Sequence, residues 1–253
     1  MRRYVALGSS FAAGPGLGRR VPGSPRPAWR STRNYAHLLA ERLDLDLVDV
    51  SYSGATAAEM LDGTPEGRPP QIEAVTADTD LVTVTGGGND VGYLTRLTLA
   101  SVPRPLGLLV RARSQVAEIG RRRDERMAAL GRTFDRLTAE IRRRAPQAEI
   151  YLVDYLTILP PDDSWPTGRL PAGIARWGRE TAARLADETR AAAERAGCGY
   201  VAASQASREH HAWAAEPWTR QFHYSLRGGA PYHPTARGMR AVAGLIEATR
   251  TGR

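Results

Sequence analysis

Two adjacent serines end the first apolar stretch of the chain. Ser9 and Ser10 follow the segment Arg3–Leu7, which has the length and composition of a short buried strand. A serine hydroxyl becomes a nucleophile when a nearby base, most often histidine, takes its proton. A serine after a strand is also a common turn residue or helix cap. The pair is therefore a candidate for nucleophilic chemistry, with a structural role as the alternative.

Further candidates follow the next two expected strands. Gly54 comes after the segment Leu45–Val50, and Asn89 follows three glycines after the segment Asp80–Thr85. Parallel strands of an α/β sheet present their carboxyl ends at one edge, where ligands bind. We therefore expect the two serines to meet Gly54 and Asn89 at that edge.

The elements that must position these residues alternate along the chain. The expected strands are Arg3–Leu7, Leu45–Val50, Asp80–Thr85, Ala148–Leu156 and Gly199–Ser204. The expected helices are Arg30–Leu43, capped by Ser31 or Thr32, Ala55–Leu61, Pro105–Arg144 with a break near Gly120, Gly173–Gly197 and Pro234–Arg250. This alternation predicts parallel strands joined by helical crossovers. We expect a single domain over residues 1–253, a flavodoxin-like, three-layer α/β/α sandwich around a five-stranded parallel sheet.

Glycines after a first strand also suggest a nucleotide site, but the spacing argues against one. Arg19 stands where the G-x-G-x-x-G motif requires its last glycine, and a P-loop is excluded because the chain has no lysine. Ala12 stands where the G-x-S-x-G elbow of the α/β-hydrolases requires a glycine. None of the three common glycine-loop motifs therefore explains this turn.

Four short motifs resemble the sequence blocks of the SGNH/GDSL hydrolases. The segment "GSSFAAG" (Gly8–Gly14) resembles G-D-S-x-x-x-G, with Ser10 at the nucleophile position. The second, third and fifth blocks resemble "YSGATA" (Tyr52–Ala57), "GGND" (Gly87–Asp90) and "HPTARGM" (His233–Met239). Each motif is weak alone. Their order and their positions at strand ends make the resemblance specific, and it covers essentially the whole chain.

The resemblance implies a serine ester hydrolase that needs no metal or cofactor. Ser10 would form an acyl intermediate, with His233 as the base that takes its proton. The backbone N–H groups of Ser10 and Gly54 and the side-chain amide of Asn89 would form the oxyanion hole. Ser9 replaces the aspartate of the first block, and we interpret it as structural, hydrogen-bonded within its loop.

The chain departs from the family at the group that orients the histidine. Many members carry an acid three residues before it, as D-x-x-H, whereas this chain has Ala230 in "APYH". A backbone carbonyl that accepts from Nδ1–H would still select the useful tautomer. We expect the carbonyl of Ala230 to do so, with the carboxylate of Glu209 or Glu216 as the alternative.

The other histidines are weaker candidates for a functional role. His210, His211 and His223 lie in the loop before His233. A zinc site is conceivable there, but no zinc motif accompanies them, so we expect surface or wall positions and no metal. His37 lies in an expected helix and is interpreted as a surface or packing residue.

Charge and cysteine content limit the partners. The net charge of +8 is carried by arginine alone. In the densest segment, Gly120–Arg144, acidic residues alternate with arginine at helical spacing, so we expect a salt-bridged helix face and no nucleic-acid partner. The apolar run after Arg3 is too short for a signal peptide, and no run is long enough for stable membrane insertion. Cys198 is the only cysteine, so we expect a cytoplasmic protein without disulfides.

The expected partner is a small-molecule ester with a short-to-medium acyl chain. The apolar segment Tyr93–Val110 would line an acyl pocket or form a lid, with an ordinary core helix as the alternative. A carbohydrate O-acetylesterase is a second hypothesis, because the same blocks serve that chemistry and Trp213 and Trp218 could stack on a sugar. A non-catalytic binding module is a third hypothesis, favoured only by the missing acid. The sequence carries no signal for the natural substrate or the oligomeric state.

Overall fold

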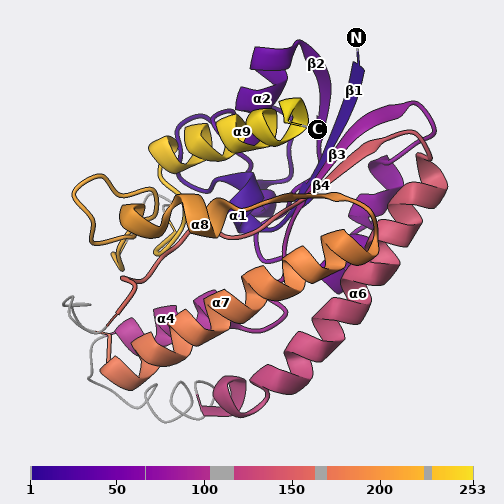
Figure 1. The fold of residues 1–253 in the computed structure, drawn as a ribbon. Coiled ribbons are helices and arrows are strands. Elements are labelled where there is room, and N and C mark those ends of the chain that lie inside the picture. The colour runs from indigo at the N-terminus through magenta and orange to yellow at the C-terminus, as the bar shows by residue number, and fades with distance from the viewer. Residues whose placement is uncertain (1, 66, 103–116, 163–169, 225–229, 253) are drawn as a thin grey trace.

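Five parallel strands form the centre of the molecule. The computed structural model describes residues 2–65, 67–102, 117–162, 170–224 and 230–252. The strands lie in the order β2-β1-β3-β4-β5, and each neighbouring pair is parallel (Figure 1). Their bounds are β1 Arg2–Gly8, β2 Leu45–Asp49, β3 Thr79–Thr85, β4 Glu149–Val153 and β5 Gly199–Val201. The predicted five-stranded parallel sheet is confirmed.

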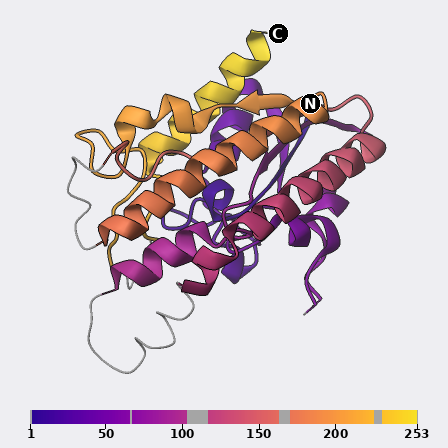
Figure 2. The ribbon, with the colours of Figure 1, turned by 60° about the horizontal axis from the view of Figure 1, so that its bottom comes forward.

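Helices cover both faces of this sheet. On one face α2 packs against α9, and on the other α6 packs against α7, with α3 beside α6 and α4 beside α7 (Figures 1 and 2). These helices are α2 Tyr35–Leu43, α3 Ala57–Asp62, α4 Tyr93–Ser101, α6 Arg123–Arg144, α7 Ala172–Arg195 and α9 Ala236–Thr251. The shorter helices are α1 Ser10–Ala13, η1 Arg26–Ala28, η2 Gln71–Ala74, α8 Ala203–Ala206 and η3 Arg208–His210. The predicted three-layer sandwich is confirmed.

The central strands are apolar because helices cover both of their faces. Strand β1 lies between β2 and β3, and Val5 pairs with Val48 on one side and with Val82 on the other. The four residues Tyr4–Leu7 are completely buried. A strand that is buried on both faces is expected to be a continuous apolar run, as this one is. The same burial holds the end of β1, and therefore the serines after it, at a fixed place.

Several predicted boundaries are wrong at the helix ends. The first long helix begins at Tyr35, and its cap is Asn34, whose side chain accepts from the His37 N–H at 3.0 Å. The predicted cap Ser31 instead donates its hydroxyl to the Leu17 carbonyl at 2.7 Å. This bond ties the long loop after β1 to the start of the helix. Ser31 is therefore used for tertiary packing and is not available as a cap.

The helix predicted over Pro105–Arg144 is shorter in the structure. Helix α6 begins at Arg123, after a helical stretch over 117–121 and a turn residue at 122, close to the predicted break at Gly120. Residues 103–116 of the prediction lie outside the described residues. Helix α4 was predicted only as one of two alternatives for the segment that begins at Tyr93. Its buried residues Tyr93 and Leu97 belong to the core, next to α7.

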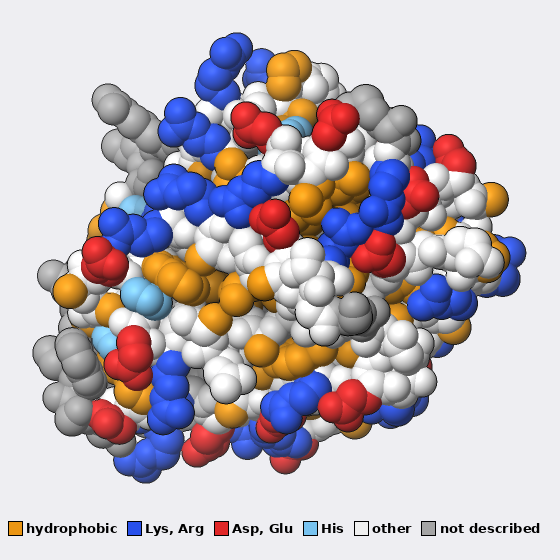
Figure 3. Space-filling view, turned by 45° about the horizontal axis from the view of Figure 1, so that its top comes forward, with side chains coloured by type: hydrophobic (Ala, Val, Ile, Leu, Met, Phe, Trp, Pro, Cys, Tyr) orange, Lys and Arg blue, Asp and Glu red, His pale blue; other side chains and the backbone are white. Residues whose placement is uncertain are grey.

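The arginine-rich helix α6 is paired with acidic side chains, as predicted. Within the helix, Glu140 accepts from Arg143 at 2.6 Å and from Arg144 at 2.7 Å. Between helices, Asp135 of α6 accepts from Arg195 of α7 at 2.9 Å. Basic and acidic side chains are also interspersed on the face shown in Figure 3. In the described part of the chain, no helix has the length and apolar character needed to cross a bilayer.

Candidate active site

The first serine turn is built by close contacts between β1 and β3. The Ser9 N–H donates to the Thr85 carbonyl at 2.9 Å, which carries the chain out of β1 along the neighbouring strand. Gly8 lies so close to β3 that a Cβ atom there would come within 2.9 Å of the Thr85 oxygen. Ser10 is then the first residue of the one-turn helix α1 and is nearly buried. Its N–H has no acceptor within the helix, because the first turn of a helix leaves its N–H groups free.

The side chains of His233 and Ser10 are in contact, although the two residues are 223 positions apart in the sequence. His233 Nε2 lies 2.7 Å from Ser10 Oγ, and Nδ1 lies 2.8 Å from the carbonyl oxygen of Pro231. A carbonyl can only accept, so Nδ1 carries the ring proton and Nε2 accepts from the Ser10 hydroxyl. This tautomer is the one that can take a proton from the serine.

The group that orients the histidine differs from the expected one. It is the carbonyl of Pro231 and not that of Ala230, although both lie in the predicted segment. Glu216 pairs with Arg237 at 2.9 Å, and Glu209 lies near His211, where it partly offsets the lowering of the His211 pKa by burial. Among the residues that the structure describes, no carboxylate forms a hydrogen bond or ion pair with His233.

The histidine is neutral at ordinary pH. Burial lowers the pKa of His233 to about 4, because a charged imidazolium is poorly solvated in the interior. The Pro231 carbonyl opposes this shift, and the positive charge of Arg220 adds to it. A neutral imidazole beside a serine hydroxyl is ready to accept a proton.

Gly54 and Asn89 face the same cleft as Ser10 and His233. The cleft has a volume of about 470 Å³ and is also lined by Pro15, Trp29, Ser53, Leu94, Thr95, Thr98, Leu99 and Ala230. Gly54 has φ +87°, a left-handed conformation that favours glycine, although nothing lies within 4 Å of where a Cβ would be. Glycine is thus needed there for its backbone conformation. The structure brings together all four predicted site residues.

The Asn89 side chain is held by the neighbouring turn. Its Nδ2 donates to the Ala55 carbonyl at 2.9 Å, which orients the amide and leaves its second N–H available. The next residue, Asp90, accepts from the Ala57 N–H at 3.0 Å at the start of α3. Burial raises the pKa of Asp90 to about 6. The turns that carry Gly54 and Asn89 are therefore connected to each other.

Two residues that support the site, Tyr155 and Gln71, were not predicted from the sequence. The Tyr155 hydroxyl lies 2.9 Å from Ser9 Oγ and accepts from the Gly88 N–H at 3.2 Å, so it joins the serine turn to the asparagine turn. Ser9 was expected to form a hydrogen bond within its own loop; its side chain is hydrogen-bonded, but the partner, Tyr155, is distant in sequence. Gln71 bonds both backbone groups of Gly8, at 2.8 and 3.0 Å. Tyr155 lies near the end of the expected fourth strand, close to the edge of the sheet where the site was expected, and could have been suspected for that reason; Gln71 carries no comparable signal.

The histidines of the preceding loop do not line this cleft. His210 stacks on Trp218 with ring centroids 4.2 Å apart, and the backbone N–H of Trp213 donates to His211 Nδ1 at 3.2 Å. His223 Nδ1 lies 3.0 Å from the Gln221 carbonyl. In the described segments, no three His, Cys, Asp or Glu side chains come close enough together to hold a metal ion.

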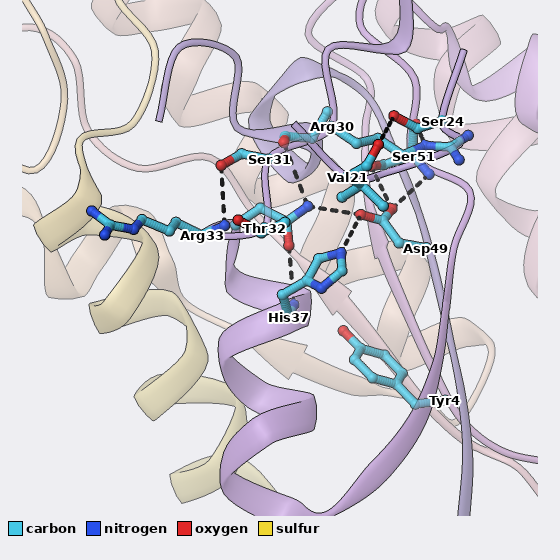
Figure 4. Close-up of polar contacts among 12 residues, drawn as sticks. Tyr4, Val21, Ser24, Arg30, Ser31, Thr32, Arg33, His37, Asp49 and Ser51 are labelled. Carbon is cyan, nitrogen blue, oxygen red and sulfur yellow. Dashed lines mark hydrogen bonds and ion pairs between the residues drawn. The ribbon is translucent and has the colours of Figure 1, made fainter. Parts of the chain in front are cut away.

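His37 packs beside a buried aspartate. Its Nε2 lies 3.6 Å from Asp49 Oδ2, in a polar cluster that also includes Arg30 and Ser51 (Figure 4). The side chain is about one quarter exposed. His37 is thus a partly buried packing residue, in agreement with the interpretation of the sequence.

Comparison with known proteins agrees with this geometry. Residues 6–241 match the model of the GDSL-like lipase/acylhydrolase family. Lipase 2 of Streptomyces coelicolor is 34% identical, over 95% of this chain and 83% of the relative, and a lipase of Streptomyces rimosus is 27% identical, over 93% and 81%.

Solved structures share the fold. The phospholipase A1 of Streptomyces albidoflavus superposes with a TM-score of 0.83 at 22% identity, over 98% of this chain and 99% of that one. A family 2 carbohydrate esterase from Corynascus superposes with a TM-score of 0.56 at 20% identity, over 99% of this chain and 66% of that one. With its sheet order, its four motifs at one edge of the sheet and this match over nearly its whole length, the chain belongs to the GDSL-like lipase/acylhydrolase family of ester hydrolases.

Proposed function

We propose that the protein hydrolyses small-molecule carboxylic esters through an acyl intermediate on Ser10. Ser10 Oγ attacks the ester carbonyl carbon while its proton moves to His233 Nε2. The tetrahedral intermediate then expels the alcohol, which takes that proton from His233. A water molecule, deprotonated by the same nitrogen, releases the acid and restores the serine. The observation that carries this proposal is the 2.7 Å contact between Ser10 Oγ and a histidine whose other nitrogen is bonded to a carbonyl.

The same proposal assigns the oxyanion hole to three N–H groups. Among the described residues the Ser10 N–H, at the start of α1, has no backbone acceptor, and the Gly54 N–H lies in a turn that lines the cleft. The second N–H of the Asn89 amide is the third donor. Such donors stabilise the negative charge that develops on the carbonyl oxygen in the transition state.

The shape of the cleft supports a short-to-medium acyl chain. Leu94 and Leu99 of α4 give the cleft an apolar wall, so the described part of the segment beginning at Tyr93 lines the pocket. A volume of about 470 Å³ is in the range of small-molecule sites. Thr95 and Thr98 on the same helix also line the cleft and add hydroxyls to this wall.

An O-acetylated carbohydrate is the second candidate substrate. Trp29 lines the cleft and is 40% exposed, with the Arg20 guanidinium 5.6 Å from its ring centroid, so the exposed part of the indole offers a surface for stacking on a sugar ring. The tryptophans named from the sequence do not have this role, because Trp218 is stacked on His210 and neither it nor Trp213 lines the cleft.

A substrate panel with a covalent probe tests the proposal. We expect p-nitrophenyl esters from acetate to octanoate to be hydrolysed faster than palmitate, and a fluorophosphonate adduct to be found on Ser10 by mass spectrometry. Faster release of acetate from an acetylated oligosaccharide would favour the second candidate. An adduct on Ser9, or no hydrolysis of any ester, would contradict the proposed mechanism. The cytoplasmic location and the single domain over residues 1–253 stay predictions.

A further inference from the structure

Tyr232 lies between Pro231 and His233, whose carbonyl and imidazole form a hydrogen bond. Its backbone conformation is unfavourable. Among the described residues, only Trp29, Asp44 and Tyr232 have positive φ without being glycine, and Tyr232 has φ +64°. A bulky side chain rarely adopts this left-handed conformation, because its Cβ then crowds the backbone. Such a conformation persists where the surrounding structure holds it, and it is frequent at functional sites.

The side chain of Tyr232 shows what holds the conformation. Its ring is almost completely buried, with the rings of Trp213 and Phe222 centred 6.5 and 6.3 Å away. Its hydroxyl lies 2.6 Å from Ser101 Oγ. The Ser101 hydroxyl donates to the Leu97 carbonyl at 2.8 Å, so Tyr232 is the donor of the shorter bond.

The conformation of Tyr232 determines where the Pro231 carbonyl points. That carbonyl belongs to the peptide plane joining Pro231 to Tyr232, and rotation about φ of Tyr232 turns this plane relative to the next residue. In the observed turn the carbonyl oxygen lies 2.8 Å from Nδ1 of His233. With the ordinary negative φ, the plane would take another orientation relative to the imidazole.

We propose that Tyr232 is a positioning residue: together with Ser101 it forms a latch that holds the Pro231 carbonyl on His233. The inference rests on the proposed function, since it assumes that His233 serves Ser10. Ser101 lies on α4, the helix that also lines the substrate cleft with Leu94 and Thr98. One helix therefore forms the wall of the cleft and holds the turn that aims the base. The left-handed turn at Tyr232, held by the bond to Ser101, orients the histidine in place of the carboxylate that D-x-x-H would supply.

Two conservative variants and a matched control test the latch. Tyr232→Phe and Ser101→Ala each remove the hydroxyl bond but leave the ring in place. We expect kcat to fall by roughly 10-fold with KM changed less than about 2-fold, because a small misplacement of a catalytic group affects the reaction more than binding. The control is Tyr4→Phe, which removes an equally buried bond, 2.7 Å to Thr83, inside the sheet. Thermal unfolding curves of all three variants check that each of them is folded.

The pH profile separates positioning from general destabilisation. The Pro231 carbonyl stabilises the protonated imidazole, so loosening it should lower the pKa of His233 further. The acidic limb of kcat/KM should then move to lower pH in Tyr232→Phe and Ser101→Ala. A variant that is only less stable loses active protein without moving this limb, and Tyr4→Phe should leave it in place.

A glycine–alanine pair tests the backbone strain itself. Tyr232→Gly and Tyr232→Ala both lose the ring and the hydroxyl, but only glycine adopts positive φ without penalty. We expect kcat of the glycine variant to exceed that of the alanine variant by roughly 5-fold. Equal values would mean that the left-handed turn is not what aims the histidine.

The outcomes distinguish the latch from the proposed function. If the wild-type protein hydrolyses esters and is labelled on Ser10, but Tyr232→Phe and Ser101→Ala behave like Tyr4→Phe, the latch is wrong and the proposed function stands. If the wild-type protein neither hydrolyses esters nor labels on Ser10, both are overturned. If Tyr232→Phe and Ser101→Ala lose kcat and their acidic limb moves to lower pH, both the latch and the proposed function are supported.

Discussion

Two histidines of this chain lie beside buried oxygen acceptors, in different ways. His37 has a carboxylate near its ring, with 3.6 Å between Nε2 and Asp49 Oδ2 (Figure 4). Among the described residues, His233 Nδ1 has the Pro231 carbonyl as its hydrogen-bond partner, and Nε2 has the Ser10 hydroxyl. The histidine with a neighbouring acid is thus not the one placed for catalysis.

The partners of Asp49 explain its role. It accepts from Asn34 Nδ2 at 2.8 Å, from the Ser51 N–H at 3.0 Å and from the Ser51 hydroxyl at 2.6 Å. Within the described residues, His37 Nε2 makes no hydrogen bond. Burial lowers the pKa of His37, and the charge of Asp49 partly restores it. The Asp49 carboxylate therefore holds the loop after β2 in place, and it forms no hydrogen bond with His37.

The comparison shows what a serine hydrolase needs from the partner of its histidine. A carbonyl supplies no charge, but it selects the tautomer and fixes the ring, which is a large part of what an aspartate does. What distinguishes the two sites is the hydroxyl on the opposite nitrogen. The following predictions test this contrast, from the largest expected effect to the smallest.

Loss of the hydroxyl should remove the activity. We expect Ser10→Ala to lower kcat by about 10⁴-fold or more, because no acyl intermediate can form. The control Ser9→Ala removes a hydroxyl one position earlier, which is bonded to Tyr155, and should keep most of the activity. Stopped assays on p-nitrophenyl acetate measure both. A Ser9 variant as inactive as the Ser10 variant would contradict the assignment.

Loss of the asparagine amide should affect the transition state. We expect Asn89→Ala to lower kcat by about 10²–10³-fold with a smaller change in KM, as for other oxyanion donors. Steady-state kinetics on the best ester of the panel gives the two constants. If KM rises while kcat is unchanged, Asn89 binds substrate in the ground state and is not an oxyanion donor.

Adding the missing acid should change the pH dependence of the catalytic histidine. In the wild-type protein kcat/KM should fall as the pH drops through about 4, where His233 becomes protonated and can no longer act as a base. Ala230→Asp places a negative charge near the ring, which favours the imidazolium and should move this limb to higher pH by roughly one unit. Ala230→Asn, of similar size and uncharged, is the control. An unmoved limb in the aspartate variant would show that position 230 does not reach the ring.

Disruption of the other histidine site should affect stability and leave the chemistry intact. We expect Asp49→Ala to lower the free energy of unfolding by about 1–3 kcal/mol, since Asn34 and Ser51 lose their acceptor. His37→Gln should change kcat less than about 2-fold and stability by less than about 0.5 kcal/mol. Urea unfolding and ester hydrolysis measure these quantities. A large loss of kcat in His37→Gln would mean that this pair takes part in the reaction.

The sequence by itself determined the sheet and the four residues of the site. Ser10, Gly54 and Asn89 each follow an apolar strand within a few residues, and a parallel sheet brings such strand ends to one edge. His233 was recognised because the segment His233–Met239 resembles the fifth sequence block of the family. The strand ends are local patterns that amino-acid types and spacing predict, whereas the roles of the four residues were inferred from their resemblance to the sequence blocks of the family.

Only the tertiary structure decided how the site is supported. The bond from Tyr155 to Ser9 spans 146 positions and the bond from Tyr232 to Ser101 spans 131, and no spacing rule predicts such pairs. The carbonyl that meets His233 depends on the φ angle of Tyr232, which a tyrosine adopts only because its buried ring and hydroxyl are held from another part of the chain. Backbone direction in a strained turn is set by these distant contacts, whereas the strand-end motifs are set by the residues beside them.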